Sequence, residues 1–217
     1  MKANVWLLVC AGVIAGCSGG TPEQTKTGER ELIEGPPERE AYTSELTKPD
    51  CVTWEGFKTT GSHEGGFKQC EGFMSFGPED DLRAVEVTVD IASMFSDNDK
   101  LTMHLLSPDF FTADRFPRAK FKSLGVRRLE GGPESGRYEI DGAMTIKDVT
   151  QEITVQAEVR REGNEWVGTA EFVLPRVSYG VAYLGRPDDL IKDEANVAVE
   201  LRAPYDPRGL VAEELGK

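Results

Sequence analysis

Side chains able to catalyse a reaction at neutral pH are sparse in this sequence of 217 residues. Its two histidines, His63 and His104, stand apart, and no Ser-His-Asp pattern, HExxH motif or glycine-rich phosphate loop accompanies them. The numerous carboxylates fall in loops or at outward positions of the expected strands, as on a solvated face. A distant metal pair or a general base formed by the histidines stays open, but loop or packing roles are favoured. The sequence therefore predicts no enzyme, no catalytic residue and no metal ligand.

Of the four cysteines, only Cys51 and Cys70 lie in the part of the chain with the composition of a folded domain. An even pair is typical of exported proteins in an oxidising compartment. A disulfide between them would close a loop of about 20 residues and stabilise the fold by roughly 3 kcal/mol. Two buried free thiols or a metal site are the alternatives. Because no CxxC motif or Cys/His cluster accompanies the pair, we favour the disulfide.

The first residues have the plan of a secretory signal. Lys2 precedes an apolar run of about a dozen residues, which is too short to span a bilayer as a helix. The run ends in residues 14–17 (IAGC), which resemble the bacterial lipobox, where small residues precede the cysteine that receives a diacylglyceryl group. We expect cleavage before Cys17 and attachment to the membrane through lipid on Cys17; an ordinary signal peptide or an uncleaved anchor is the alternative. Ser18, rather than Asp, after the cysteine favours the outer membrane, facing the periplasm.

The charge of the chain limits its partners. The formal net charge is −13, and loss of residues 1–16 removes one positive charge, at Lys2, and makes it −14. Such a chain repels phosphate backbones, so nucleic acid is not expected as a partner. Anionic lipid headgroups would repel it as well, so inserted lipid rather than charge would hold it on a membrane.

Composition divides the remaining chain into three parts. Residues 17–50 are rich in Glu, Pro, Gly and Thr, and we expect the lipidated N-terminus to continue there as a disordered acidic linker. Residues 51–204 contain the apolar patterns of a folded domain. Residues 205–217 are expected to form a polar tail.

Alternation of apolar and polar residues is the main structural signal of the folded part. Residues 85–91 (VEVTVDI) alternate strictly, which is the pattern of a strand with one buried face. Turn residues separate this segment from others of the same kind, which predicts an all-β barrel or sandwich, with a short helix and loop in 100–114. The eight expected strands are 52–59, 66–76, 85–91, 119–129, 137–146, 153–159, 165–172 and 195–201.

The segment from Leu105 to Ser123 resembles the YceI family, in which a stretch like L-x-S-x-D-F-F-x-x-x-x-x-P-x-A-x-F-x-S links two strands. Residues 142–150 resemble the family's G-x-L-T-x-x-G-x-T turn but depart from it at Met144 and Asp148. Residues 175–180 resemble its R-x-x-F/Y-G motif. The resemblance covers about 51–203. The matching residues of the first segment are Leu105 or Leu106, Ser107, Asp109, Phe110, Phe111, Pro117, Ala119, Phe121 and Ser123.

The resemblance implies a lipocalin-like, eight-stranded antiparallel barrel that holds a polyisoprenoid tail, so the expected ligand is a polyprenyl lipid or a quinone, with no covalent cofactor. Protein partners are not predicted. An eight-stranded barrel can be filled by its own side chains or hold one slender ligand, so a structural lipoprotein with a filled core is the alternative. An envelope enzyme is a third hypothesis. Lys58, His104 and Arg176 are the candidates for contacting a headgroup at the mouth. The expected apolar wall is Trp54, Val87, Val89, Phe110, Phe121, Ile140, Met144, Val155, Trp166, Phe172, Val199 and Leu201.

Overall fold

The computed structural model describes residues 42–206. The expected signal peptide, the lipid site Cys17, most of the linker and nearly all of the tail lie outside the described residues. Among the residues described, no helix is long and apolar enough to cross a membrane.

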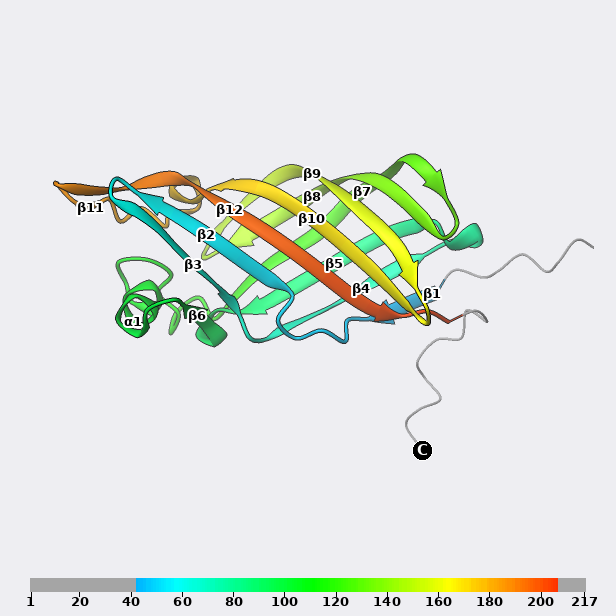
Figure 1. Ribbon diagram of the computed structural model, residues 1–217, viewed down its shortest axis with the longest axis horizontal. Helices are drawn as coiled ribbons and strands as arrows, with labels where there is room; N and C mark the ends of the chain where they lie inside the picture. Colours follow the sequence, from blue (N-terminus) through cyan, green and yellow to red (C-terminus); the bar gives the residue numbers. More distant parts are fainter. Residues whose placement is uncertain (1–41, 207–217) are drawn as a thin grey trace, which may run out of the picture. The chain divides into compact units, whose positions relative to one another are not determined.

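The described chain is almost entirely antiparallel β-structure, curled into a barrel (Figure 1). Neighbouring strands follow the order β1-β4-β5-β7-β8-β9-β10-β12-β2-β3-β6, and β11 pairs with β12. The elements are β1 (Tyr42–Glu45), β2 (Val52–Lys58), β3 (Gly61–Phe67), β4 (Cys70–Phe76), the 3-10 turn η1 (Pro78–Asp80), β5 (Leu82–Asp90), η2 (Ile91–Ser93), β6 (Met94–Ser96), α1 (Asp99–Leu106), β7 (Arg118–Gly132), β8 (Ser135–Ile146), β9 (Val149–Glu162), β10 (Glu165–Pro175), η3 (Arg176–Tyr179), β11 (Gly185–Arg186) and β12 (Asp189–Pro204).

The all-β barrel is confirmed, but the expected number of eight strands is wrong. The strands predicted from alternation are present, whereas β1, β6, β11 and residues 61–65 of β3 were not expected, and the segment 66–76 is divided between β3 and β4. Alternation missed most of β3 because this strand contains three glycines instead of β-branched residues. Packing requires at least one of them, since a Cβ at Gly65 would lie 2.1 Å from the Phe95 carbonyl oxygen and 2.5 Å from the indole of Trp54.

A bent strand closes the barrel at one end. Strand β5 pairs with β4, and after the 3-10 turn η2 the same chain continues as β6, which pairs with β3. The short helix α1 follows, capped by the Asn98 side chain, which accepts hydrogen bonds from the amides of Lys100 and Leu101. The helix expected within 100–114 is therefore confirmed at its N-terminal half.

The segment 42–50 closes the other end, and its assignment to the disordered linker is wrong. Strand β1 pairs with β4, the Leu46 amide donates to the carbonyl oxygen of Gly72 (2.9 Å), and the Thr47 amide donates to that of Arg202 (2.8 Å). The segment thus joins β4 to β12. Its polar composition suggested disorder, but its backbone groups find partners on both flanking strands.

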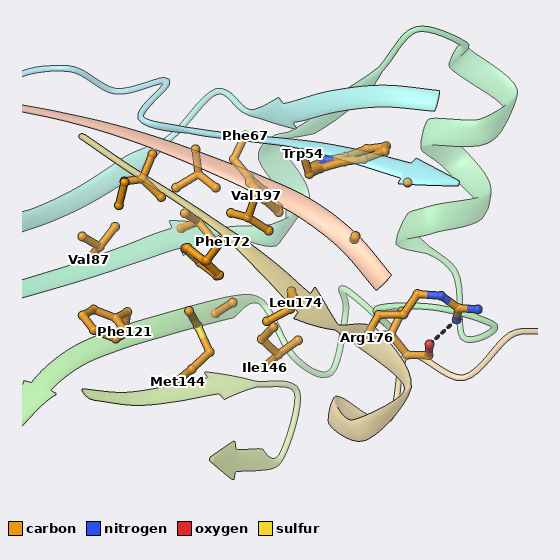
Figure 2. Close-up of a pocket in the computed structure, with 18 of the residues that line it drawn as sticks. Trp54, Phe67, Val87, Phe121, Met144, Ile146, Phe172, Leu174, Arg176 and Val197 are labelled. Carbon is orange, nitrogen blue, oxygen red and sulfur yellow. Dashed lines mark hydrogen bonds between the residues drawn. The ribbon is translucent and has the colours of Figure 1, made fainter. Parts of the chain in front are cut away.

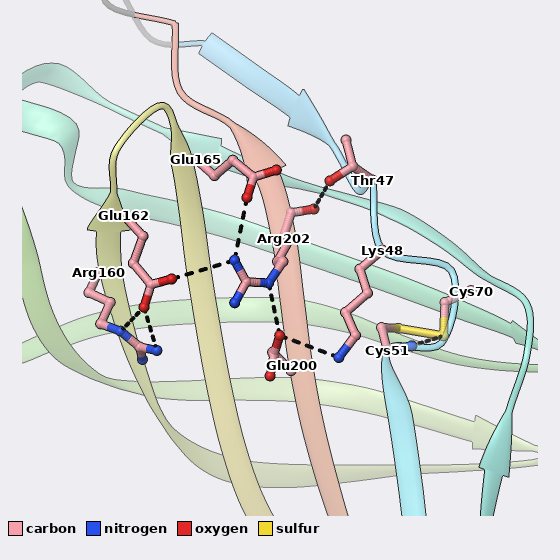
Figure 3. Close-up of polar contacts among 9 residues, drawn as sticks. All are labelled: Thr47, Lys48, Cys51, Cys70, Arg160, Glu162, Glu165, Glu200 and Arg202. Carbon is pink, nitrogen blue, oxygen red and sulfur yellow. Dashed lines mark hydrogen bonds and ion pairs between the residues drawn. A yellow bond between two sulfur atoms is a disulfide. The ribbon is translucent and has the colours of Figure 1, made fainter.

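Ion pairs and a disulfide reinforce this seam (Figure 3). Glu200 pairs with Lys48 (3.3 Å) and with Arg202 (2.9 Å), and the hydrogen bond from Arg202 holds the pKa of the Glu200 carboxyl below its usual range. Cys51 and Cys70 form a disulfide with their Cα atoms 6.0 Å apart, beside the same segment.

The interior is filled at the seam end, which we call the base. Trp166 is 1% exposed, stacks on Phe76 with ring centroids 4.6 Å apart, and donates from its indole nitrogen to the Tyr42 hydroxyl (2.7 Å). Tyr205, assigned above to the tail, is buried against Trp166. The polar tail therefore cannot begin before Asp206. Burial raises the pKa of the Tyr42 hydroxyl well above its usual range.

Candidate ligand cavity

The opposite half of the barrel encloses a cavity of about 550 Å³. This volume falls within the range of about 300–1,000 Å³ that is typical of small-molecule sites. Side chains from strands on different sides of the barrel project toward this common interior (Figure 2). The cavity reaches the surface at the end formed by α1, the β2–β3 turn, η3 and β11, which we call the mouth.

The structure places eleven of the twelve expected wall residues on the cavity. Ten of them lie on strands, where alternate residues face the same side of the sheet, and Phe110 lies in the loop after α1. The exception is Trp166, which faces inward as expected but lies in the filled base and does not line the cavity. Tyr42 and Tyr205, which lie outside the expected domain, occupy the interior next to Trp166. The wall residues are Trp54, Val87, Val89, Phe110, Phe121, Ile140, Met144, Val155, Phe172, Val199 and Leu201.

Small side chains on the inward face keep the interior open, and sequence reasoning did not single them out. Ala170 of β10 pairs in register with Ala157 of β9 and Val199 of β12, and all three line the cavity. Gly168 lies one inward position nearer the base and also lines it. Alternation within 165–172 does place Ala170 and Gly168 inward. It does not show whether the inward side chains of all strands together fill the interior, so the sequence left the cavity undecided. Other wall residues that were missed include Val52, Phe67, Met74, Val85, Ala119, Ile146, Leu174, Val181, Tyr183, Ala195 and Val197.

Lys58 lies at the mouth, as expected, and is held by an ion pair. Its ammonium is 2.9 Å from the Asp189 carboxylate, and Asp189 also accepts hydrogen bonds from the side chain and amide of Thr60. The hydrogen bond from Lys58 is the main reason that the pKa of Asp189 lies below its usual value. This pair joins the β2–β3 turn to the start of β12.

Arg176 lines the mouth, but its guanidinium binds backbone carbonyl oxygens. Its guanidinium donates hydrogen bonds to the carbonyl oxygens of Val181, Ile191 and Lys192, and the residue is buried. Figure 2 shows the Arg176 side chain among the residues that line the pocket. Burial lowers the pKa of the guanidinium, and the Asp193 carboxylate opposes that shift. Arg176 therefore fixes the turn after η3 against β12, and most of its donor capacity is used there.

The two histidines both line the cavity but bind different aspartates. His104 of α1 is 2.8 Å from a carboxylate oxygen of Asp109, whereas His63 of β3 is 2.9 Å from one of Asp97. The ring of His104 packs edge-on against Phe110 and Tyr183. No group of three or more His, Cys, Asp or Glu residues within 42–206 is arranged to hold a metal ion. The geometry thus gives His104 a packing role at the mouth.

A lysine in the β8–β9 turn ties the mouth together. The Lys147 ammonium donates to the carbonyl oxygens of Phe110 and Gly180, both at 2.9 Å. Phe110 follows α1, and Gly180 ends η3, so one side chain links the two segments that border the opening. This turn lies where the family-like motif departs from its usual glycine at Asp148.

Comparison with known proteins assigns the domain. A family model described as the YceI-like domain matches residues 42–203. The chain belongs to the YceI-like domain family. A UPF0312 protein of Photorhabdus laumondii is 32% identical over 106 residues, which cover 48% of this chain and 53% of that protein. A UPF0312 protein of Pseudomonas fluorescens is 36% identical over 110 residues, covering 48% of this chain and 54% of that protein. This chain spans about half the length of these curated relatives.

Solved structures with the same fold are more distant in sequence. Burkholderia cenocepacia BcnA is 20% identical, covers 74% of this chain and 96% of its own, and superimposes with a TM-score of 0.62. A polyisoprenoid binding domain from Saccharophagus degradans is 12% identical, with coverages of 77% and 100% and a TM-score of 0.60. The YceI-like domain matched here begins at Tyr42, the first residue of β1, which agrees with the role of that strand in closing the barrel.

Proposed function

We propose that this YceI-like domain binds an apolar isoprenoid-type lipid, a polyprenyl lipid or a quinone, inside its barrel. The observation that carries the proposal is the cavity of about 550 Å³, walled along its depth by aliphatic and aromatic side chains. Such a wall offers shape and apolar area, so burial at about 25 cal/mol per Å² would drive binding. A solved relative is described as a polyisoprenoid binding domain, which supports this ligand class.

Organic extraction of protein purified from its native host, followed by mass spectrometry, tests the ligand class. We expect an isoprenoid to accompany the protein in amounts approaching one per barrel. Repeated absence of any isoprenoid from such extracts, together with failure of the binding assay described next, would overturn the proposal.

Titration with geranylgeraniol, a C20 isoprenoid alcohol, tests binding at the cavity itself. A change in the Trp54 fluorescence reports occupancy, because Trp54 lines the cavity and Trp166 does not. Ala170→Phe places a ring in the interior and should abolish this change. Ala198→Phe makes the same change on β12 at a residue that does not line the cavity, and should leave the affinity unchanged. Equal affinity of the two variants would show that the probe binds elsewhere.

We further propose that the domain is attached to the outer membrane, on its periplasmic side, through lipid on Cys17. The support is the lipobox-like ending of the N-terminal apolar run and the serine that follows it. Metabolic labelling with radioactive palmitate should mark the wild-type chain and not the Cys17→Ala variant. Recovery of labelled protein in the inner-membrane fraction would contradict the location while leaving the lipidation intact.

A further inference from the structure

Exposed apolar side chains gather around the mouth. Met103 of α1 is 66% exposed, and Leu184 and Leu190, which flank the β11 turn, are 64% and 52% exposed. Single exposed leucines are ordinary on protein surfaces, so exposure alone decides nothing. Their placement is informative, because all three belong to segments that border the opening of the apolar cavity.

These residues are neighbours in space as well as at the mouth. The rings of His104 and Tyr183, each next in sequence to Met103 or Leu184, have centroids 4.9 Å apart. The Leu184 carbonyl accepts a hydrogen bond from the Ile191 amide, which closes the hairpin that carries β11. Each exposed residue thus adjoins one that lines the cavity, namely His104, Tyr183 and Ile191. We call Met103, Leu184 and Leu190 the rim.

We propose that the rim inserts into the surface of a lipid bilayer, so that the ligand passes between bilayer and cavity without crossing water. This inference rests on the proposed lipid-binding function. An isoprenoid chain leaving a bilayer through water exposes its whole apolar surface, whereas an apolar opening pressed into the bilayer keeps that surface covered. The rim and the wall then form one continuous apolar surface from membrane to cavity.

The length of chain before the barrel allows this orientation. The chain enters the barrel through β1 at the base, and Figure 1 shows β1 and β11 at opposite ends of the barrel. Residues 17–41 can extend to at most about 85 Å. Strand β12, with 16 residues, spans about 50 Å between base and mouth. A chain held at Cys17 is therefore long enough for the mouth to face the membrane that holds it.

Charge at the hairpin indicates which bilayer surface fits. Arg186 and Lys192 are outnumbered by Asp188, Asp189 and Asp193 on the same segment. Attraction to anionic headgroups is therefore not the driving force, and the rim suits a zwitterionic surface entered by apolar side chains. Binding should change little with ionic strength.

A fluorescent label on the rim tests the proposal. The compact unit 36–217 contains every described strand, both apolar clusters and the disulfide, and it lacks Cys10 and Cys17. In this unit, Leu184→Cys and Leu129→Cys each provide one free thiol for an environment-sensitive dye. Phosphatidylcholine vesicles should shift the emission of the dye at position 184 to the blue and leave that at position 129, near the base-end turn of β7, unchanged. Equal shifts at both positions, or none at 184, would overturn the proposal.

Vesicle sedimentation adds a matched pair of variants. Leu184→Asp with Leu190→Asp should weaken binding to phosphatidylcholine vesicles by about tenfold or more. Leu124→Asp with Leu129→Asp, at residues 60% and 39% exposed on β7, should leave binding unchanged. A shift of the dye that depends on protein concentration without vesicles would identify a second copy of the chain as the occupant and overturn membrane docking. Geranylgeraniol titration of the same proteins separates the two proposals. If the protein binds geranylgeraniol but not vesicles, only membrane docking is refuted. If it binds vesicles but not geranylgeraniol, only the cavity ligand is refuted.

Discussion

The base and the mouth half of this barrel are built from the same alternating strands but differ in what fills them. Strand β10 passes through both: its inward residues are Trp166 in the base, then Gly168 and Ala170, then Phe172 in the mouth half. At the base, Tyr42 and Tyr205 enter from either side of the barrel sequence and pack against Trp166. In the mouth half, no side chain of residues 42–206 fills the space between the small wall residues in this way. Alternation thus decides which residues face inward, and the volumes that meet at one depth decide whether the interior is solid.

The largest difference should appear when one aromatic residue is removed from each region. Trp166→Ala should lower the free energy of unfolding by about 3–5 kcal/mol, because it removes a stacked ring and leaves a cavity in a filled core. Phe172→Ala should cost only about 1 kcal/mol, since the lost atoms border existing space. Chemical denaturation measures both. Similar losses for the two variants would show that the mouth half is packed as tightly as the base.

The disulfide gives a second contrast, between stability and binding. Replacing Cys51 and Cys70 together by serine should lower the free energy of unfolding by roughly 3 kcal/mol, because the bridge restricts the unfolded chain. The geranylgeraniol affinity of the folded variant should stay within about twofold, because neither cysteine lines the cavity. A large loss of affinity at full folding would mean that the seam shapes the cavity.

Replacing a small residue by a large one should also distinguish the base from the mouth half, with a smaller change in the free energy of unfolding. Ala203→Phe, at a fully buried base position, should lower the free energy of unfolding by about 1–3 kcal/mol through overpacking. Ala170→Phe should leave stability nearly unchanged while abolishing probe binding, since the new ring enters open space. Denaturation and titration of the same two proteins measure this, and equal destabilisation would argue against a hollow interior.

Acidification should weaken the base seam slightly. The pKa of Glu200 in the folded protein lies below the value of 4.5 expected in the unfolded chain. The ion pairs of Glu200 therefore stabilise the fold above about pH 4.5. This contribution is lost as the pH falls through the lowered pKa. Glu200→Gln should cost about 0.5–1 kcal/mol at pH 7, because the pair is partly exposed, and nothing near pH 2. Thermal unfolding from pH 2 to 7 measures the difference. Glu171→Gln, exposed on the outer face of β10, is the control and should show a smaller pH dependence.

Some features of this protein followed from local patterns. Strict alternation predicted β5, β9, β10 and β12, because a strand with one buried face needs an apolar residue at every second position. The same rule placed the wall residues inward. The parity of the cysteines and their expected compartment indicated the bridge between Cys51 and Cys70, which the structure contains.

Other features depended on contacts between distant segments. The polar segment 42–50 looks disordered by itself, but β4 and β12 lie where its backbone can bond to both. The glycines of β3 suggest a loop until the indole of Trp54 and the carbonyl of Phe95 are seen to leave no room for a Cβ at Gly65. Arg176 looks like a headgroup ligand until three backbone carbonyls are found to surround it.

By itself, the sequence determined the all-β class, the inward face of the main strands and the apolar character of the interior, because each of these follows from the period of a single strand. Only the tertiary structure decided that the base is solid and the mouth half hollow. That outcome depends on which side chains from β1, β10 and the residues after β12 meet at the same depth. The pattern of one strand does not show how much space the side chains of segments far apart in the chain fill together.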